Sequence, residues 1–275
     1  MIEMNQGPVR KALRSIEFIF DFLFPSRCPT CDTLVPEGED HGFCQKCFPD
    51  IKLIEQPICF VCGQPFGIMG NEPETDSSGI KESQVSSAQL RDHLCGDCIK
   101  KSHSFDLARS ATIYRGKIRE AIQFFKFSNM PEFSRPLAKI MISNRIVTET
   151  FSDLDTIIPV PLHKERLKQR GYNQALLLAC EIKKEYALEL QGHNLRRTRH
   201  TLPQVGLGKK ERRKNVKGAF EVHKPEKIRG KKILLVDDVY TTGNTLNECA
   251  RVLKKAGAKK VTAITVARVS IIDFD

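Results

Sequence analysis

The stretch KILLVDDVYTTGNT, residues 232–245, decides the fold of this 275-residue chain. Its first part, residues 232–236, is an apolar run after one lysine and predicts a buried β-strand. A helical pattern follows over residues 245–256, and Gly257 ends it, as glycine often does at a helix C-terminus. The apolar face of that helix consists of Leu246, Cys249, Ala250 and Leu253. A strand that leads through a loop into a helix is typical of a parallel α/β sheet, in which ligands bind at the carboxyl ends of the strands.

The loop of this unit carries side chains suited to a phosphorylated sugar. Asp237 and Asp238 leave the predicted strand together, and adjacent carboxylates suit the hydroxyls of a polyol or a metal-bound sugar. Residues 241–245 (TTGNT) then enter the helix N-terminus, where backbone N–H groups, threonine hydroxyls and the helix dipole form a phosphate cradle. Together these features predict a ribose 5-phosphate ligand. An acidic N-cap with an ordinary turn explains any one of the residues but not the set.

The second half of the chain alternates between strands and helices. Further strands are predicted at residues 108–114, 156–160 and 261–269. Helical patterns lie at residues 118–127, 133–147 and 173–186. This order predicts a parallel sheet flanked by helices.

Eight of the ten cysteines lie before residue 100, and all eight occur as CxxC pairs. The pairs are Cys28 and Cys31, Cys44 and Cys47, Cys59 and Cys62, and Cys95 and Cys98. Two thiolates three positions apart on a tight turn point at one ion, so two pairs complete a tetrahedral site for Zn²⁺. We predict two structural zinc sites, because four cysteines per ion leave no open position for catalysis. Sequential pairing gives spacers of 12 and 32 residues, interleaved pairing gives 27 and 47, and both stay open.

The alternative role for the eight cysteines is a disulfide framework in a secreted protein, and the start of the chain argues against it. Its basic residues lead into an apolar stretch broken by acidic ones, so we expect no signal peptide, and no apolar run is long enough for a transmembrane segment. Residues 1–26 instead predict an amphipathic helix that packs on the protein itself, with a membrane or a partner as the alternative. Residues 27–104 form the predicted zinc domain, with a polar, flexible loop at residues 67–92, and residues 105–275 form the α/β domain.

The net charge of +11 is unevenly distributed. Residues 1–104 carry 10 basic and 15 acidic side chains, a net charge of −5, so the rest of the chain carries +16. Residues 195–232 alone hold 14 basic and 3 acidic side chains, a net charge of +11. So basic a segment predicts a polyanionic partner such as nucleic acid. Phe220 is its only aromatic residue, which disfavours base stacking.

The stretch VDDVYTTGNT resembles the phosphoribosyl pyrophosphate (PRPP) signature of type I phosphoribosyltransferases. Other stretches are similar to the ComF family, in its ComFC and GntX types: PVPLHKERLKQRGYNQALLLA from Pro159, RTRHTLPQVGLGKKERRKNVKGAF from Arg197, YRGKIREAIQFFKF from Tyr114, and the CxxC pairs behind a segment ending in FPSRCPTC. The resemblance covers nearly the whole chain apart from residues 67–92. It implies an α/β, type I phosphoribosyltransferase fold with a small N-terminal double zinc-ribbon domain.

The resemblance also implies roles for individual residues. Asp237 and Asp238 match the acidic pair that holds the ribose 2- and 3-hydroxyls, and they are the candidate catalytic residues. The PRPP-binding set is Asp237, Asp238, Val239, Tyr240, Thr241, Thr242, Gly243, Asn244 and Thr245, of which the last five match the loop around the 5-phosphate. Candidate pyrophosphate contacts are Pro161, Leu162, His163, Lys164, Arg166, Arg170 and Lys126. Arg166 and Arg170 could equally be solvated helix residues. Mg²⁺ bridges pyrophosphate and ribose oxygens in this family.

Between Arg197 and Asn215, the basic segment has the position of the flexible loop that closes over PRPP in related transferases. Its candidate residues are Arg197, Arg199, Lys209, Lys210, Arg212 and Arg213. The alternative is that basic side chains of this segment bind nucleic-acid phosphates without reading sequence, namely Arg196, Arg197, Arg199, Lys209, Lys210, Arg212, Arg213, Lys214 and Lys217. The lack of aromatic residues other than Phe220 favours the diphosphate over the reading of bases.

Two compatible functions follow from the resemblance. The first is a phosphoribosyltransferase that binds Mg-PRPP, with an acceptor that the sequence does not identify. Its alternative is a PRPP-sensing or nucleic-acid-binding accessory protein without transferase activity, because Thr241 stands where purine-salvage members place an aspartate. The second is an accessory protein of natural transformation that assists uptake of single-stranded DNA. Its implied partners are a competence helicase and a membrane DNA channel, and its implied location is the cytoplasm or the inner face of the membrane.

Overall fold

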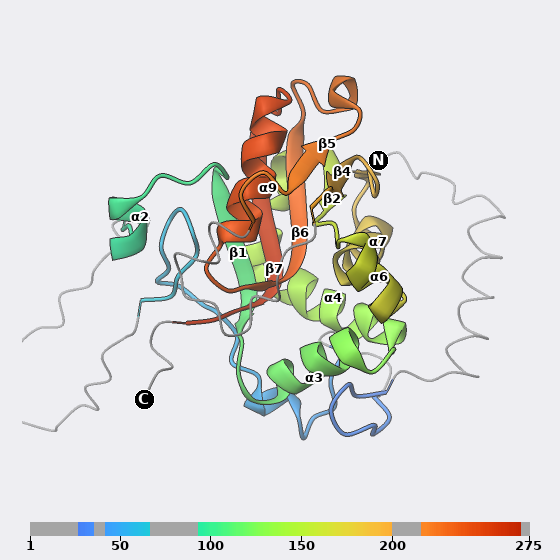
Figure 1. Ribbon diagram of the computed structural model, residues 1–275. Helices are drawn as coiled ribbons and strands as arrows, with labels where there is room; N and C mark the ends of the chain where they lie inside the picture. The colour runs from blue at the N-terminus through green and yellow to red at the C-terminus, as the bar shows by residue number, and fades with distance from the viewer. Residues whose placement is uncertain (1–26, 36–41, 67–92, 200–215, 271–275) are drawn as a thin grey trace, which may run out of the picture.

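The computed structural model describes residues 27–35, 42–66, 93–199 and 216–270 (Figure 1). Three sequence predictions fall on residues outside these ranges: the N-terminal helix, the polar loop of residues 67–92 and most of the basic loop. Among the described residues, no helix is both long enough and apolar enough to cross a membrane.

A five-stranded, all-parallel sheet forms the centre of the molecule, with the strand order β1-β7-β6-β2-β3. Its strands are β1 (Leu107–Ile113), β2 (Thr156–Pro159), β3 (Glu189–Leu190), β6 (Lys232–Tyr240) and β7 (Lys260–Arg268). Parallel strands need crossover connections, which helices usually supply. The structure therefore confirms the parallel α/β sheet that the alternating pattern predicted.

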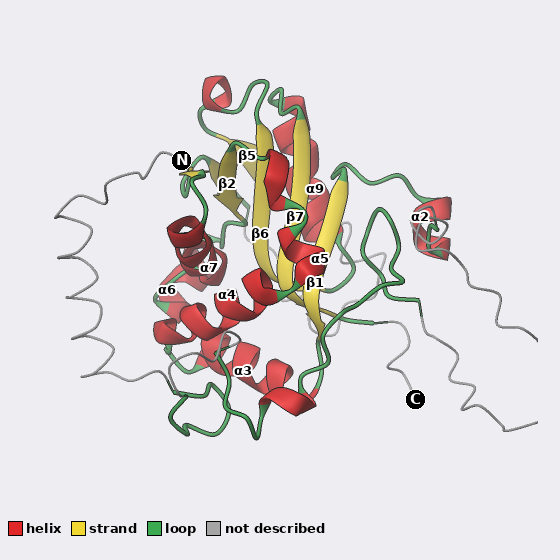
Figure 2. Cartoon of the chain, turned by 180° about the vertical axis from the view of Figure 1, so that it is seen from behind, coloured by secondary structure: helices red, strands yellow, loops and turns green. Residues whose placement is uncertain are grey.

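Helices cover both faces of this sheet and the carboxyl ends of its strands (Figures 1 and 2). They are α3 (Gly116–Phe127), α4 (Ser134–Ser143), α5 (Arg145–Thr148), α6 (Lys164–Arg170), α7 (Gln174–Glu185) and α9 (Asn244–Lys255). A short α2 (Gly96–Lys100) and the 3-10 turns η1 (Phe48–Asp50), η3 (Pro131–Phe133), η4 (Phe151–Asp153) and η5 (Pro225–Lys227) complete the described helical elements. Helix α9 packs on one face, α4, α5 and α7 pack on the other, and α3 lies beyond the carboxyl ends of the strands (Figures 1 and 2).

Strand β6 shows why an apolar run forms the core. Ile233 and Leu235 belong to the apolar cluster that α9 covers, whereas Leu234 and Val236 belong to the cluster beneath α4 and α7. All four side chains are fully buried, and each burial stabilises the fold by roughly 2 kcal/mol. A strand that is covered on both faces needs apolar residues at every position, so the run shows no alternation.

Strand β6 is longer than the sequence predicted. It continues through Asp237 and Asp238 to Tyr240 because β7 runs alongside it to the end. On the other side, β2 stops at Pro159, opposite Val236. The prediction of a loop at the two aspartates was therefore wrong. They lie in β6, in the part that still pairs with β7 but no longer with β2.

The predicted helix over residues 133–147 is interrupted at Asn144. Its backbone is extended there, with φ −82° and ψ 117°, and its side chain accepts a hydrogen bond from the N–H of Ile146 to cap α5. Nδ2 of the same side chain donates to the carbonyls of Ile54 at 3.1 Å and Ala111 at 3.0 Å. These three hydrogen bonds satisfy a buried amide and explain the break.

The zinc domain covers an edge of the sheet. Strand β1 has β7 on one side, and on its other side Leu53 forms an antiparallel bridge with Thr112. The N–H of Ala108 donates to the carbonyl of Val61 at 2.8 Å. This pairing occupies backbone groups that an open edge strand would leave unpaired.

A two-stranded antiparallel ribbon, β4 (Leu195–Arg197) and β5 (Phe220–Val222), flanks the predicted basic loop on both sides. The N–H of Gly218 donates to Oε1 of Glu248 in α9 at 2.7 Å. The ribbon is thus attached to the helix that follows β6.

Candidate functional site

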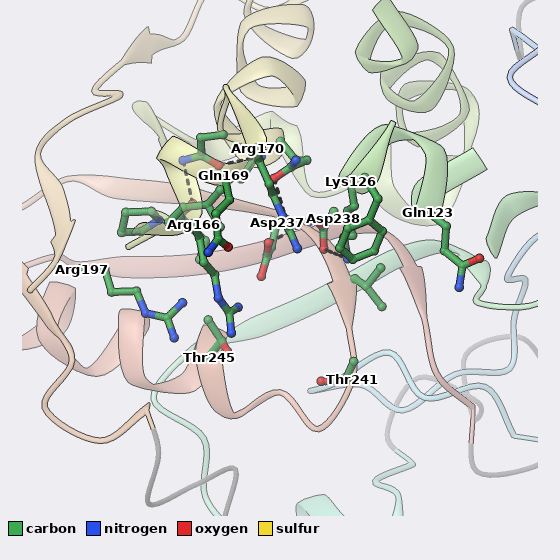
Figure 3. Close-up of a pocket in the computed structure, with 18 of the residues that line it drawn as sticks. Gln123, Lys126, Arg166, Gln169, Arg170, Arg197, Asp237, Asp238, Thr241 and Thr245 are labelled. Atoms are coloured by element: carbon green, nitrogen blue, oxygen red, sulfur yellow. Dashed lines mark hydrogen bonds and ion pairs between the residues drawn. The ribbon is translucent and has the colours of Figure 1, made fainter. Parts of the chain in front are cut away.

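A pocket of about 880 Å³ opens at the carboxyl end of the sheet (Figure 3). It lies where β2 has ended and β6 continues, between α3, α6, the start of α7 and the start of α9. Its charged and amide or hydroxyl side chains are Tyr114, Gln123, Lys126, Asn129, Arg166, Lys168, Gln169, Arg170, Asn173, Gln174, Arg197, Asp237, Asp238, Tyr240, Thr241 and Thr245. This is the position at which parallel α/β sheets bind ligands.

Asp237 and Asp238 reach the pocket from opposite faces of β6. Because successive strand residues point to opposite sides, Asp237 continues the face that α9 covers and Asp238 continues the other face. Oδ1 of Asp238 lies 2.8 Å from Nζ of Lys126 in α3. The N–H of Asp238 donates to Oδ1 of Asp237 at 2.9 Å. In the described part of the chain, Asp238 has an ion-pair partner and Asp237 has none.

The carboxyl group of Asp237 is difficult to ionise. Burial raises its pKa to about 7, and the charge of Asp238 acts in the same direction against the N–H of Asp238, Lys126 and Arg197. Near neutral pH the group is therefore divided between its protonated and ionised forms. A ligand that brings a cation or a hydroxyl donor beside it would favour the ionised form and release a proton.

The loop between β6 and α9 contributes Thr241 and Gly243 to the pocket, and the first turn of α9 contributes Thr245. Gly243 adopts a left-handed backbone conformation, with φ 71° and ψ 0°, and begins α9 without a side-chain cap. Oγ1 of Thr242 and Nδ2 of Asn244 are buried without a hydrogen-bond partner, which is uncommon for buried polar atoms. A helix N-terminus offers N–H donors and the positive end of the helix dipole, so this loop suits an anion.

Three arginines gather to one side of Asp237 in Figure 3: Arg166 and Arg170 from α6, and Arg197 from the end of β4. Burial lowers the pKa of Arg166, and the charge of Arg170 lowers it further. Burial, followed by the charge of Arg166, likewise lowers the pKa of Arg197. A strongly anionic ligand would reduce the repulsion between these guanidinium groups, so the arginines favour such a ligand.

The pocket contains most, but not all, of the residues that the sequence singled out. The residues that line it are Asp237, Asp238, Val239, Tyr240, Thr241, Gly243, Thr245, Pro161, Leu162, Arg166, Arg170, Lys126 and Arg197. Thr242, Asn244, His163, Lys164 and Arg199 are not among its lining residues. His163 instead caps α6 with Nδ1, which accepts from the N–H of Glu165 at 3.3 Å. Lys209, Lys210, Arg212 and Arg213 lie outside the described residues.

Sequence reasoning missed the lining residues Gln123, Lys168, Gln169, Asn173 and Gln174. Only Asn173 gave a signal, because it stands directly before a helical pattern and asparagine is a favoured N-cap. Its Oδ1 accepts from the N–H of Ala175 at 3.0 Å, and its Nδ2 donates to the carbonyl of Val160 at 3.1 Å. The other four are polar helix residues, and such residues usually face solvent.

The eight CxxC cysteines form two tetrads, one of Cys28, Cys31, Cys44 and Cys47 and one of Cys59, Cys62, Cys95 and Cys98. Within each tetrad the four Sγ atoms lie within 4.8 Å of one another. A tetrahedral zinc ion with Zn–S bonds of about 2.3 Å separates its sulfurs by about 3.8 Å, so both tetrads fit zinc. The grouping is sequential, which resolves the pairing that the sequence left open.

The fold and the two kinds of site define a class of protein. A parallel sheet whose central strand carries an acidic pair near its carboxyl end and leads into an anion loop matches the phosphoribosyltransferase arrangement, and the tetrads match the structural zinc sites of a double zinc ribbon. Two family models agree with this reading. The model of the phosphoribosyl transferase domain matches residues 179–271, and the model of the double zinc ribbon domain matches residues 19–99.

Relatives identify the family within this class. Competence protein F of Haemophilus influenzae is 33% identical over 233 residues, which are 83% of this chain and 91% of the relative. Competence protein ComFC of Bacillus subtilis is 28% identical over 237 residues, 83% of this chain and 85% of the relative. The chain therefore belongs to the competence protein F (ComF) family. Among solved structures, a glutamine PRPP amidotransferase from B. subtilis is 18% identical and covers 50% of this chain and 26% of its own, with a TM-score of 0.32, too low for a functional comparison.

Proposed function

We propose that the pocket binds PRPP together with Mg²⁺. One observation carries the proposal: an acidic pair, an anion loop and three arginines line the same pocket at the carboxyl end of β6. A carboxylate pair suits the two ribose hydroxyls, and the loop at the N-terminus of α9 suits the 5-phosphate. The arginines on α6 and β4 suit the diphosphate, since guanidinium groups bind phosphate oxygens in a bidentate manner.

The same residues account for the cation. Mg²⁺ prefers hard oxygen ligands, and Asp237 and Asp238 offer carboxylates next to the place assigned to the diphosphate. The ion would neutralise part of the diphosphate charge as pyrophosphate leaves. Lys126 already neutralises Asp238 in the free protein, so the lysine must share or give up this carboxylate when the ligand binds.

Phosphoribosyl transfer is the reaction that such a complex supports. The bond between the ribose C1 and the pyrophosphate oxygen breaks through an oxocarbenium-like transition state, and an acceptor adds to C1. The arginines would stabilise the charge that develops on the departing pyrophosphate. The acceptor is unidentified, and a PRPP sensor without transfer would use the same contacts.

Calorimetric titration with PRPP and Mg²⁺ tests the ligand assignment. The double variant Asp237→Asn with Asp238→Asn should lose at least about 100-fold in affinity, because two charged hydrogen-bond acceptors are removed. Glu149→Gln, at an exposed carboxylate that ends α5 and does not line the pocket, is the control and should bind as the wild type does. An unchanged affinity in the double variant would refute the ribose assignment. A screen of acceptor bases for pyrophosphate release then tests transfer.

A role in DNA uptake is the second candidate, supported by the name of the H. influenzae relative and by the charge of +11 on residues 195–232. The proposed partners are single-stranded DNA, a competence helicase and a membrane DNA channel. Replacement of Lys209, Lys210, Arg212 and Arg213 by alanine should reduce the salt dependence of single-stranded DNA binding. An equal salt slope in the variant and the wild type would exclude these side chains from DNA binding.

A further inference from the structure

Two arginines lie beside the second tetrad without an acidic partner. Arg268 of β7 is 3% exposed; its Nη1 donates to the carbonyl of Cys62 at 2.6 Å, and its Nη2 donates to Oε1 of Gln64 at 2.7 Å. Arg109 of β1 donates from Nη2 to the carbonyl of Phe60 at 3.0 Å. Within the described ranges, neither guanidinium forms an ion pair with a carboxylate. A buried cation without a counter-charge is strongly destabilising.

The second tetrad can supply the missing charge. One Zn²⁺ and four thiolates carry a formal charge of 2 − 4 = −2, and the two guanidinium groups carry a charge of +2. The zinc–thiolate centre is therefore a counter-ion of matching magnitude. When the metal leaves and the four thiolates take up protons, the site becomes neutral, and Arg268 loses the negative charge beside it.

Arg268 also contacts Tyr240, and the backbone of the anion loop between β6 and α9 packs on the ring of this tyrosine. Cζ of Arg268 lies 4.6 Å from the ring centroid of Tyr240, the last residue of β6, which is 6% exposed. A Cβ atom added at Gly243 would come within 2.3 Å of the Tyr240 hydroxyl, so the loop backbone lies directly on this ring. Contacts thus run without a gap from Cys62 through Arg268 and Tyr240 to Gly243.

The first tetrad has different neighbours. Cys28, Cys44 and Cys47 belong to the apolar cluster that includes residues of α3 and α4. Tyr240 belongs to the other cluster, together with Cys59, Cys62 and Cys95. The two zinc sites therefore provide an internal comparison within one molecule.

We propose that Arg268 is a positioning residue that couples the second zinc site to the anion loop between β6 and α9. The zinc–thiolate centre balances its charge, Arg268 holds the ring of Tyr240, and Tyr240 holds the backbone at Gly243. Loss of zinc from the second tetrad then opens the loop locally, whereas loss from the first tetrad leaves it closed. The expected effect on PRPP affinity rests on the proposed function, because an open loop lowers apparent affinity only if the loop binds the ligand.

Two single substitutions compare the sites. Cys98→Ser changes a half-buried ligand of the second tetrad, and Cys31→Ser changes an exposed ligand of the first. Zinc content is measured for each, and hydrogen exchange is followed by mass spectrometry in peptides that cover residues 240–246. Both variants should lose about one zinc, and Cys98→Ser should show loop exchange at least about tenfold faster than Cys31→Ser. Equal loop exchange in two variants that have each lost one zinc would overturn the coupling.

A charge-removing variant tests Arg268 itself. Arg268→Met removes the guanidinium group and keeps an unbranched apolar side chain, and Arg145→Met, at a side chain that is 90% exposed, is the control. Arg268→Met should accelerate loop exchange while it retains two zinc ions, and unchanged exchange would overturn the proposal. If Arg268→Met fails to fold, Tyr240→Leu replaces it with the same expectation. If the wild type binds no PRPP, the proposed function fails, but the exchange measurement still decides the coupling.

Discussion

Nζ of Lys126 lies 2.8 Å from Oδ1 of Asp238, and the two side chains are only 17% and 13% exposed. The ion pair joins α3 to the end of β6 at the pocket. It neutralises one of two adjacent carboxylates and leaves the other, Asp237, without an ion-pair partner among the described residues. We expect the balance of charge at this point to govern the stability of the free protein and, under the proposed function, the affinity for PRPP and Mg²⁺.

Replacement of Lys126 by methionine should destabilise the free protein. The variant leaves Asp238 buried without its counter-charge, which costs about 1–3 kcal/mol in the free energy of unfolding at pH 7. Urea denaturation measures this difference, and Lys126→Arg, which keeps the charge, should recover most of it. A Lys126→Met protein within about 0.5 kcal/mol of the wild type would show that the ion pair contributes little.

The pKa of Asp237 predicts how stability depends on pH. Its folded-state pKa of about 7 lies above the ordinary value of 3.8, so the folded state holds a proton that the unfolded state has released. Stability from this group is therefore complete below about pH 4 and is lost as pH rises through 7. Residue 237 does not titrate in Asp237→Asn, so this variant does not lose the stability that the wild type loses as pH rises. The unfolding free energy of the variant minus that of the wild type should therefore increase between pH 5 and pH 8, by at most about 4 kcal/mol. Urea denaturation at several pH values measures this difference. A difference between variant and wild type that does not change with pH would contradict the raised pKa of Asp237.

Substitution of Gly243 tests the shape of the anion loop. Gly243→Ala combines a left-handed conformation with a contact of 2.3 Å to the Tyr240 hydroxyl, whereas Gly230→Ala, at φ 74°, meets no atom within 4 Å. Gly230→Ala should cost only the backbone strain, about 1–2 kcal/mol. Gly243→Ala should cost more and also weaken phosphate binding. Equal losses in thermal unfolding for the two variants would mean that Tyr240 moves aside without penalty.

Asn144 should prove important for the attachment of the zinc domain to the sheet. Asn144→Ala removes the cap of α5 and the hydrogen bonds to the carbonyls of Ile54 and Ala111, at a cost of about 2–4 kcal/mol in chemical denaturation. Asn144→Ser keeps a capping oxygen and should lose only the part due to the two carbonyls. If both variants unfold at the same denaturant concentration as the wild type, the amide does not hold this junction.

Local patterns predicted most of the fold. The apolar runs and helical periodicities gave the four long strands, and the face of α9 formed by Leu246, Cys249, Ala250 and Leu253 is buried as predicted. What the patterns missed depends on neighbours that are distant in sequence. Asp237 and Asp238 lie in a strand because β7 pairs beyond the end of β2, and the helix breaks at Asn144 because two carbonyls from other segments meet its amide.

Only the part of the candidate site that lies in one stretch of sequence was predicted as a unit, because the rest depends on residues that are distant in sequence. The acidic pair and the anion loop are contiguous in sequence, so their chemistry was evident from one stretch. Lys126, Arg166 and Arg197 come from three separate elements, and only the fold brings them together. Gln123 and Gln169 gave no signal, because an exposed amide on a helix and an amide that faces a pocket have the same sequence pattern.

Calorimetric titration of the wild-type protein with PRPP in the presence of Mg²⁺ tests the central claim most directly. Ribose 5-phosphate and pyrophosphate should be titrated in parallel, because each offers only part of the ligand to the pocket. The account predicts saturable binding of PRPP at one site per chain, at least about tenfold tighter than either fragment, since PRPP engages the anion loop, the acidic pair and the arginines at once. PRPP binding that is undetectable, or no tighter than pyrophosphate alone, would contradict it.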